Sequence, residues 1–337
     1  MDDLDLESSL RLDAVAKNLG LGRRWRGKEL IPLAVKACLV KVREAVCLDT
    51  IISCEQVADS IARSYQVRFE EVRTPEDLES LENRYLKQQK ELAFGFLRDE
   101  LSDPKVEALL IQRRKANDAD PDRWVAILNS LRTTDRAFWN KFHELGHRLA
   151  EPAQLILPLG GIRREIAARP NTLERLIDSI AAEIAFMSEV VGGPLSQLNE
   201  PDVTMEGIIN FRNWVAPTSS LLASMNAFVS RHPRMVVAFQ AEYRTKANGL
   251  ADTADLRVRP QGKSVSAENA RMLLLRNMRV PHSSCVWATY CDGMARTEVE
   301  SMTNWKTSDG SSLKWNAAIV SATKIGPVVY GTMEIVK

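Results

Sequence analysis

The pattern His-Glu-x-x-His at 143–147 constrains this chain more than any other feature of its sequence. On a helix, residues four positions apart lie on the same face, about one turn apart. The imidazoles of His143 and His147 can therefore converge on one metal ion, with Glu144 beside the first of them. This spacing predicts a zinc site in which Glu144 accepts a proton from a water bound to the metal and returns it to a leaving amine.

A chance match is improbable, because the chain has only four histidines and two of them fall in this motif. The alternative is a helix with two histidines facing solvent and a glutamate in an ordinary salt bridge. Gly146 argues against that alternative, since a glycine inside a helix costs about 1 kcal/mol relative to alanine. It therefore needs a local reason, such as the close approach of another backbone segment or of a substrate.

A catalytic zinc ion normally has a third protein ligand, and no further histidine follows closely after His147. The next predicted helix offers Glu174 and Asp178 on one face. Glu174 is the candidate ligand, and Asp178 can accept a hydrogen bond from the far nitrogen of a metal-bound histidine. Asn171 followed by Glu174 also matches a capping box, in which Glu174 would cap the helix instead. Glu165 and Glu183 are weaker rivals for the ligand position, and Glu151 is too close to the motif to swing back easily.

Two blocks of this sequence resemble the ImmA/IrrE family of metallopeptidases. RAFWNKFHELGHRL at 136–149 resembles that family's block around H-E-x-G-H-x-L, and ERLIDSIAAEIA at 174–185 is similar to its second block. The resemblance puts Glu174 at the family's third-ligand position and Asp178 at its Asn/Asp position. The family's second block usually ends in a proline soon after its leucines, whereas this chain continues to Pro194.

The resemblance implies a zinc-dependent regulatory endopeptidase that cleaves a specific protein partner, a transcriptional repressor. The ligand set suits Zn²⁺, and Mn²⁺ could replace it. We expect an α+β fold that is predominantly helical, with a zincin-like core. In this division, residues 1–100 form a helical region, 101–250 the peptidase core, and 255–337 a small α+β domain for sensing or substrate recognition. Many family members carry or accompany a helix-turn-helix unit, and the sequence shows no convincing one.

Composition limits the partners and the location. The 45 Lys and Arg residues nearly balance 44 Asp and Glu residues, which gives no global electrostatic argument for nucleic acid or membrane. The basic cluster at 23–28 is read as a solvated helix start, so direct nucleic-acid binding is not expected. Five cysteines without CxxC spacing indicate free thiols in a reducing compartment. No signal peptide or membrane-spanning run is evident, which favours the cytoplasm.

The periodicity of apolar residues predicts the elements. Helices are expected over 31–46, 54–67, 74–101, 123–131, 136–151, 171–191, 205–213, 217–246 and 266–278. Strands are expected over 106–114, 284–290, 296–302, 313–322 and 328–336, and 257–265 reads as a linker or an exposed strand.

Two other functions compete with the peptidase. The chain could be a non-catalytic binding or regulatory module of a toxin–antitoxin or phage-related system, with a structural metal. The intact Glu144 favours the peptidase, because a structural site needs no base, and Glu144→Gln separates the two. A broad digestive peptidase is disfavoured by the lack of a secretion signal. Four further residues are weak candidates for stabilising a tetrahedral intermediate: His232, Tyr243, Arg244 and His282.

Overall fold

The protein has a mixed α+β fold in which helices predominate, so the predicted fold class is confirmed. The computed structural model describes residues 3–22, 27–103, 105–114, 116–117, 119–131, 136–150, 172–197, 203–245, 254–272, 274–306, 313 and 315–336. The chain divides into two compact units, Met1–Val191 and Gly192–Lys337. These units do not coincide with the three regions expected from the sequence, whose boundaries lie near residues 100 and 250. Among the described residues, no helix combines the length and apolar content that crossing a membrane requires.

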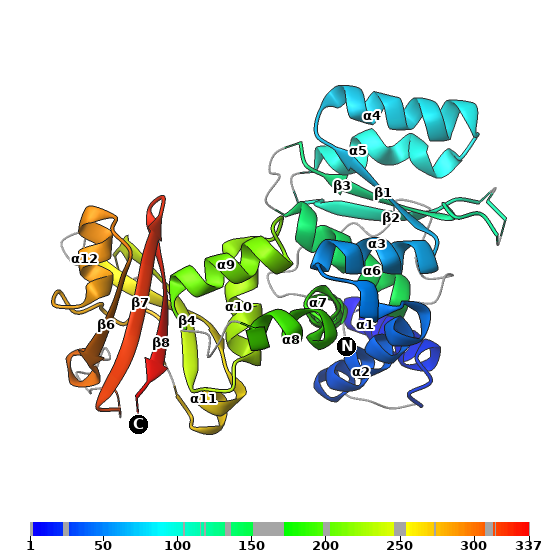
Figure 1. Ribbon diagram of the computed structural model, residues 1–337. Coiled ribbons are helices and arrows are strands. Elements are labelled where there is room, and N and C mark those ends of the chain that lie inside the picture. The colour runs from blue at the N-terminus through cyan, green and yellow to red at the C-terminus, as the bar shows by residue number, and fades with distance from the viewer. Residues whose placement is uncertain are drawn as a thin grey trace. The chain divides into compact units, whose positions relative to one another are not determined.

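A three-stranded sheet forms the centre of the first unit (Figure 1). Its strands, in spatial order, are β1 (Val67–Val72), β3 (Trp124–Asn129) and β2 (Ala108–Gln112). β1 runs parallel to β3, and β2 runs antiparallel to it. The prediction of a helix over 123–131 is wrong. All residues of β3 from Trp124 to Leu128 are buried, and a strand covered on both faces is apolar at every position, which periodicity cannot tell from a buried helix.

One face of this sheet is covered by a folded-back helical layer. The layer contains α4 (Pro75–Leu81), a π-helix (Glu82–Gln88), a 3₁₀ turn (Leu92–Phe96) and α5 (Leu97–Ser102). The single long helix predicted over 74–101 is therefore broken. Lys90 has a left-handed backbone (φ 59°) at the reversal, and Tyr85 stacks on Phe94 with ring centroids 4.3 Å apart. Folding back lets both halves bury apolar side chains on the same small sheet, which one straight helix could not do.

The other face of the sheet carries α3 and α6, and further helices pack beneath α6 (Figure 1). The helices of this part are α1 (Asp3–Asn18), α2 (Gly27–Ala45), α3 (Cys54–Ser64), α6 (Ala137–Ala150), α7 (Thr172–Ala185) and α8 (Ser188–Gln197). α7 packs against α6 on one side and against α2 on another. The helix predicted over 171–191 is therefore two helices, and the helix predicted over 54–67 gives way to β1 at its end.

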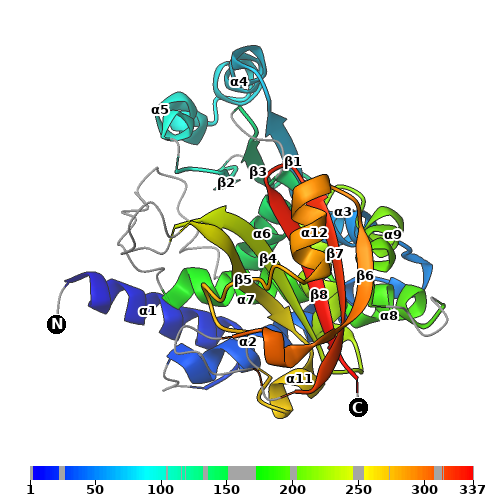
Figure 2. The ribbon, with the colours of Figure 1, turned by 90° about the vertical axis from the view of Figure 1, so that its left-hand side faces the viewer.

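A five-stranded antiparallel sheet forms the core of the second unit. Its spatial order is β5 (Asp255–Lys263), β4 (Val236–Arg244), β8 (Val328–Ile335), β7 (Ala317–Ile325) and β6 (Arg296–Ser301). The helices of this unit are α9 (Met205–Val215), α10 (Leu221–Arg231), α11 (Val265–Asn269) and α12 (Cys285–Asp292). α12 lies against β6, β7 and β8 (Figure 2), whereas α10 contacts β4 and β5. The strands predicted near 296–302, 313–322 and 328–336 are confirmed, and 257–265 is largely β5.

Three predictions in this unit are wrong. The helix expected over 266–278 is only α11, which ends at Asn269. The expected strand over 284–290 is α12, because the Ser284 hydroxyl caps its start by accepting from the Val286 amide and Gly293 ends it in a left-handed conformation (φ 79°). The expected helix over 217–246 covers α10 and then β4. α10 ends at Arg231, two residues before Pro233, whose ring excludes the preceding residue from helical geometry.

Candidate metal centre

The histidines of the motif face the same space from α6, and α7 brings a carboxylate to them. His143 Nε2 and His147 Nε2 are 3.2 Å apart. Glu174 Oε2 lies 3.3 Å from His143 Nε2, and Glu174 Oε1 lies 3.9 Å from His147 Nε2. One ligand atom from each of the three residues lies within 4.8 Å of the others. The structure therefore brings together the three residues that the sequence singles out as candidate metal ligands.

These distances fit a metal ion. Two ligand atoms that are each about 2.1 Å from a tetrahedral zinc ion lie about 3.4 Å apart. The distance of 3.2 Å between the two Nε2 atoms and that of 3.3 Å from His143 to Glu174 Oε2 lie just below this value. The distance of 3.9 Å from His147 to Glu174 Oε1 lies just above it. The donor set of two imidazole nitrogens and one carboxylate also matches the three-ligand catalytic zinc sites that leave a fourth position open. The residues present thus fit a divalent cation.

A close approach between α6 and α7 positions Glu174. A Cβ atom on Gly146 would lie 3.1 Å from Ile177 Cγ2 and 3.3 Å from the Ile177 carbonyl oxygen. Gly146 thus allows the α7 backbone to come near α6 one residue before His147. This contact supplies the local reason that the glycine requires, and it sets Glu174 and Asp178 opposite the histidines.

We expect Gly146→Ala to lower the free energy of unfolding by up to about 2 kcal/mol. Alanine gains about 1 kcal/mol of helix propensity, but overpacking against the buried Ile177 costs about 1–3 kcal/mol. Gly192→Ala in α8 is the matched control, because a Cβ there meets no atom within 4 Å. It should raise stability by about 1 kcal/mol. Equal stabilisation by both substitutions in urea unfolding would contradict the close approach.

Asp178 orients the first histidine from the same helix. His143 Nδ1 lies 3.0 Å from Asp178 Oδ1, so the neutral ring donates to Asp178 and turns the lone pair of Nε2 toward the candidate metal position. Burial lowers the pKa of His143, but its hydrogen bonds to Asp178 and Glu174 and the charge of Glu144 outweigh that effect and raise the pKa to about 10. The carboxylates around His143 thus favour a positive charge at this point, which a bound cation also supplies.

Asp178→Ala should weaken zinc affinity by about 10–100-fold, the usual cost of losing a partner of a metal-bound histidine. Asp178→Asn should cost less, because its amide oxygen can still accept from Nδ1. Competition titration with a chromophoric chelator measures both. Ser179→Ala is the control, since the Ser179 hydroxyl donates to the Arg175 carbonyl and not to the site. Unchanged affinity in Asp178→Ala would rule out this positioning role.

Glu144 lies on α6 beside these ligands and is 3% exposed. Its Oε1 atom is buried and has no hydrogen-bond partner among the residues that the structure describes. A buried carboxylate oxygen without a donor is costly, so its retention next to the histidines needs a functional reason. Accepting a proton from a bound water is the chemistry that its position suits.

Asn140 helps to hold α6 in place, although the sequence does not single it out. Its amide nitrogen donates to the Glu107 carbonyl at 3.1 Å, which anchors the start of α6 beside β2. The feature that the sequence offered is the spacing of three residues, which puts Asn140 on the same helix face as His143.

Among the rival ligands, the exposed Glu183 does not join the cluster. Three residues weighed above as ligands or as a helix cap lie outside the described residues: Glu151, Glu165 and Asn171.

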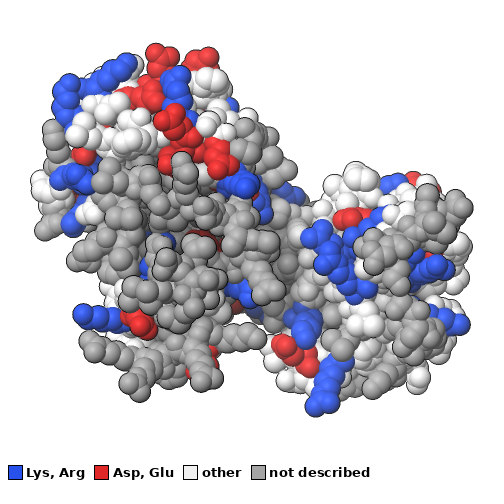
Figure 3. All heavy atoms as spheres, turned by 180° about the vertical axis from the view of Figure 1, so that it is seen from behind, with Lys and Arg blue, Asp and Glu red and all other residues white. Residues whose placement is uncertain are grey.

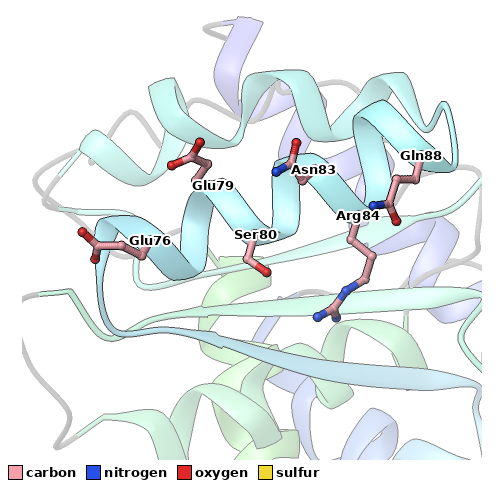
Figure 4. Close-up of a pocket in the computed structure, with 6 residues that line it drawn as sticks. All are labelled: Glu76, Glu79, Ser80, Asn83, Arg84 and Gln88. Carbon is pink, nitrogen blue, oxygen red and sulfur yellow. The ribbon is translucent and has the colours of Figure 1, made fainter.

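The other sequence candidates lie in the second unit. His232 ends α10 and is buried, at 4% exposure, and the His282 side chain is 73% exposed. Tyr243 and Arg244 lie in β4, not in the expected helix. In the first unit, a polar hollow on α4 and the π-helix (Figure 4) includes none of the candidate metal ligands, and its six lining residues come from one helical stretch. Its Arg84 is already paired with Glu70, so the hollow offers no comparable chemistry.

Comparison with known proteins leaves the chain without a family. No family model matches it, and no curated protein matches it. One similar solved structure is described as a Mycobacterium tuberculosis transcriptional regulator, with 12% sequence identity, 83% of this chain and 81% of that chain covered, and a TM-score of 0.33. A likeness with so low a TM-score supports no conclusion about function.

Proposed function

We propose that this protein is a metal-dependent endopeptidase that cleaves a specific protein partner, with Glu144 as the general base. The observation that carries the proposal is the convergence of His143, His147 and Glu174 beside Glu144, whose buried Oε1 atom has no hydrogen-bond partner in the described part of the chain. A divalent ion held by the three ligands would supply a Lewis acid and lower the pKa of a bound water. Glu144 would accept that water's proton and pass it to the leaving amine.

The nature of the partner follows from the resemblance to ImmA/IrrE peptidases. On that basis we propose a transcriptional repressor as the substrate and the cytoplasm as the location. Two imidazoles and a carboxylate suit Zn²⁺, and Mn²⁺ is the second candidate for the same ligands. The low exposure of the ligand side chains, 9% for His143, 11% for His147 and 25% for Glu174, supports a preorganised site rather than a surface histidine pair. The hydrogen bond from His143 to Asp178 supports the same conclusion.

The test is incubation of the zinc-loaded protein with the purified product of the neighbouring gene, read by intact-mass spectrometry. A proteome-derived peptide library serves as a second, unbiased substrate. We expect discrete cleavage that a chelator abolishes and that added zinc restores. Zinc binding without cleavage of either substrate would instead favour the non-catalytic module with a structural metal.

A further inference from the structure

Four aromatic rings of the second unit form a continuous row, which we call the ring row. Its members are His282, Trp287, Tyr290 and Tyr243. The ring centroids are 4.1 Å apart for His282 and Trp287, 6.1 Å for Trp287 and Tyr290, and 5.8 Å for Tyr290 and Tyr243. Trp287 and Tyr290 come from α12, Tyr243 from the end of β4, and His282 from the segment before α12. Side chains from three parts of the chain thus form two stacked pairs, His282 on Trp287 and Tyr243 on Tyr290, which a tilted contact between Trp287 and Tyr290 (47°) joins.

Both ends of the ring row are open to solvent. The side chain of His282 is 73% exposed, and Tyr243 is 51% exposed. His282 stacks on Trp287 at 28° and Tyr243 stacks on Tyr290 at 11°, so each end ring uses one face for its inner neighbour. The remaining face of each end ring can accept another planar ring. Free aromatic faces on the protein surface can stack on the ring of a planar ligand.

Cations accompany these rings. Lys324 Nζ lies 4.7 Å from the centre of the Tyr290 ring. Arg279 contacts Asp255 at 3.3 Å, and His282 contacts the same carboxylate at 3.8 Å, which places Arg279 beside one end of the ring row. More widely, Lys and Arg are prominent on the face of the second unit that Figure 3 draws. The ligand expected here is therefore both planar and anionic.

The segment that leads into α12 carries positive charges and no negative ones. Residues 269–291 contain three arginines and no Asp or Glu. Arg271 and Arg276 are exposed, and neither forms an ion pair within the described part of the chain. Asn277, the chain neighbour of Arg276, accepts a hydrogen bond at 3.0 Å from Arg244, the chain neighbour of Tyr243, so Arg276 lies in the region of the Tyr243 end of the ring row. An arginine near an exposed aromatic ring suits a phosphate backbone with attached bases. The nearly neutral charge of the whole chain conceals this local surface.

We propose that the ring row and its basic flank bind single-stranded nucleic acid, by stacking unpaired bases on His282 and Tyr243 and by contacts of the arginines with phosphates. Stacking requires a free base face, which a duplex does not offer along its length. The rings follow one another in a row, each in contact with the next, and do not surround a space, so they form no cage for a cationic ligand. This inference is independent of the proposed peptidase function.

The test uses the full chain and fluorescein-labelled oligo-dT, read by fluorescence anisotropy between 50 and 200 mM salt, conditions in which phosphate contacts respond strongly. We expect Tyr243→Ala and His282→Ala each to weaken binding by about ten-fold or more. Arg276→Gln should reduce the slope of log affinity against log salt by about 0.7. Trp214→Ala is the matched control, an aromatic residue of α9 that is 46% exposed and not part of the ring row.

Competing ligands decide the outcome. Preference for oligo-dT over its duplex and over poly-glutamate supports the proposal if the two end-ring variants lose it and the control keeps it. No binding of oligo-dT, equal binding of duplex or poly-glutamate, or equal affinity in all variants would overturn it, as would binding of thymidine monophosphate as tight as that of the strand. Because His282 is largely exposed, His282→Ala remains informative even where Tyr243→Ala proves unstable.

Discussion

Glu144→Gln is expected to slow cleavage of the protein partner by about 10²–10⁴-fold, the usual contribution of a positioned general base. The amide has nearly the same shape as the carboxylate but accepts no proton. The side chain is 3% exposed and its Oε1 atom has no partner among the described residues, so a neutral amide should not destabilise the fold. Single-turnover cleavage followed by mass spectrometry measures the rate, and chelator competition checks that zinc affinity is retained.

Glu183→Gln is the matched control for this experiment. It removes a carboxylate from an exposed position of α7 that is outside the metal cluster, and it also tests a rival ligand. Its cleavage rate and zinc affinity should equal those of the wild type. If Glu144→Gln cleaves as fast as the wild type, the carboxylate is not the general base. That result would contradict the proposed mechanism.

Zinc at 1,000 times its dissociation constant should raise the melting temperature of the metal-free first unit by about 8–16 °C. Binding to the folded state alone contributes about 4.1 kcal/mol at that excess. Each kcal/mol shifts the midpoint of a unit of this size by about 2–4 °C. Differential scanning calorimetry of the chelated protein, with and without added zinc, measures the shift.

Ligand variants give this prediction its specificity. His147→Ala and Glu174→Ala should each lose most of the shift, because each removes one of three ligands. His282→Ala is the control, since that histidine lies in the second unit and is 73% exposed. A full shift in Glu174→Ala would mean that this carboxylate only caps α7, the alternative that its spacing from Asn171 allows.

The site could be predicted in large part because its geometry is local. Two histidines four residues apart meet on any helix, whatever surrounds it. Glu174 and Asp178 are related by the same spacing on α7. The distance between α6 and α7 could not be predicted, because it depends on Ile177 lying against Gly146 and not on any repeat in the sequence. The role of Asn140 could not be predicted for a related reason. Its hydrogen-bond partner is the backbone carbonyl of Glu107, which is distant in the sequence and which any residue type could provide.

The sheets were harder to predict than the helices because their stability comes from distant partners. β1 follows α3 with hardly a break, and only its pairing with β3 makes it a strand. The central β3 is apolar on both faces and was mistaken for a helix. In contrast, β7 and β8 are joined by a short turn at Gly326, and local turn chemistry was enough to identify them.

The packing of α7 between α6 and α2 ties the metal centre to the beginning of the chain. Glu174 lies on α7, and α7 also packs against α2, which precedes the first sheet in the chain. A fragment that starts at α6 would keep both imidazoles yet lack the support that seats the carboxylate. Saturation mutagenesis should accordingly find inactivating positions within α2, a helix that supplies none of the three candidate ligands.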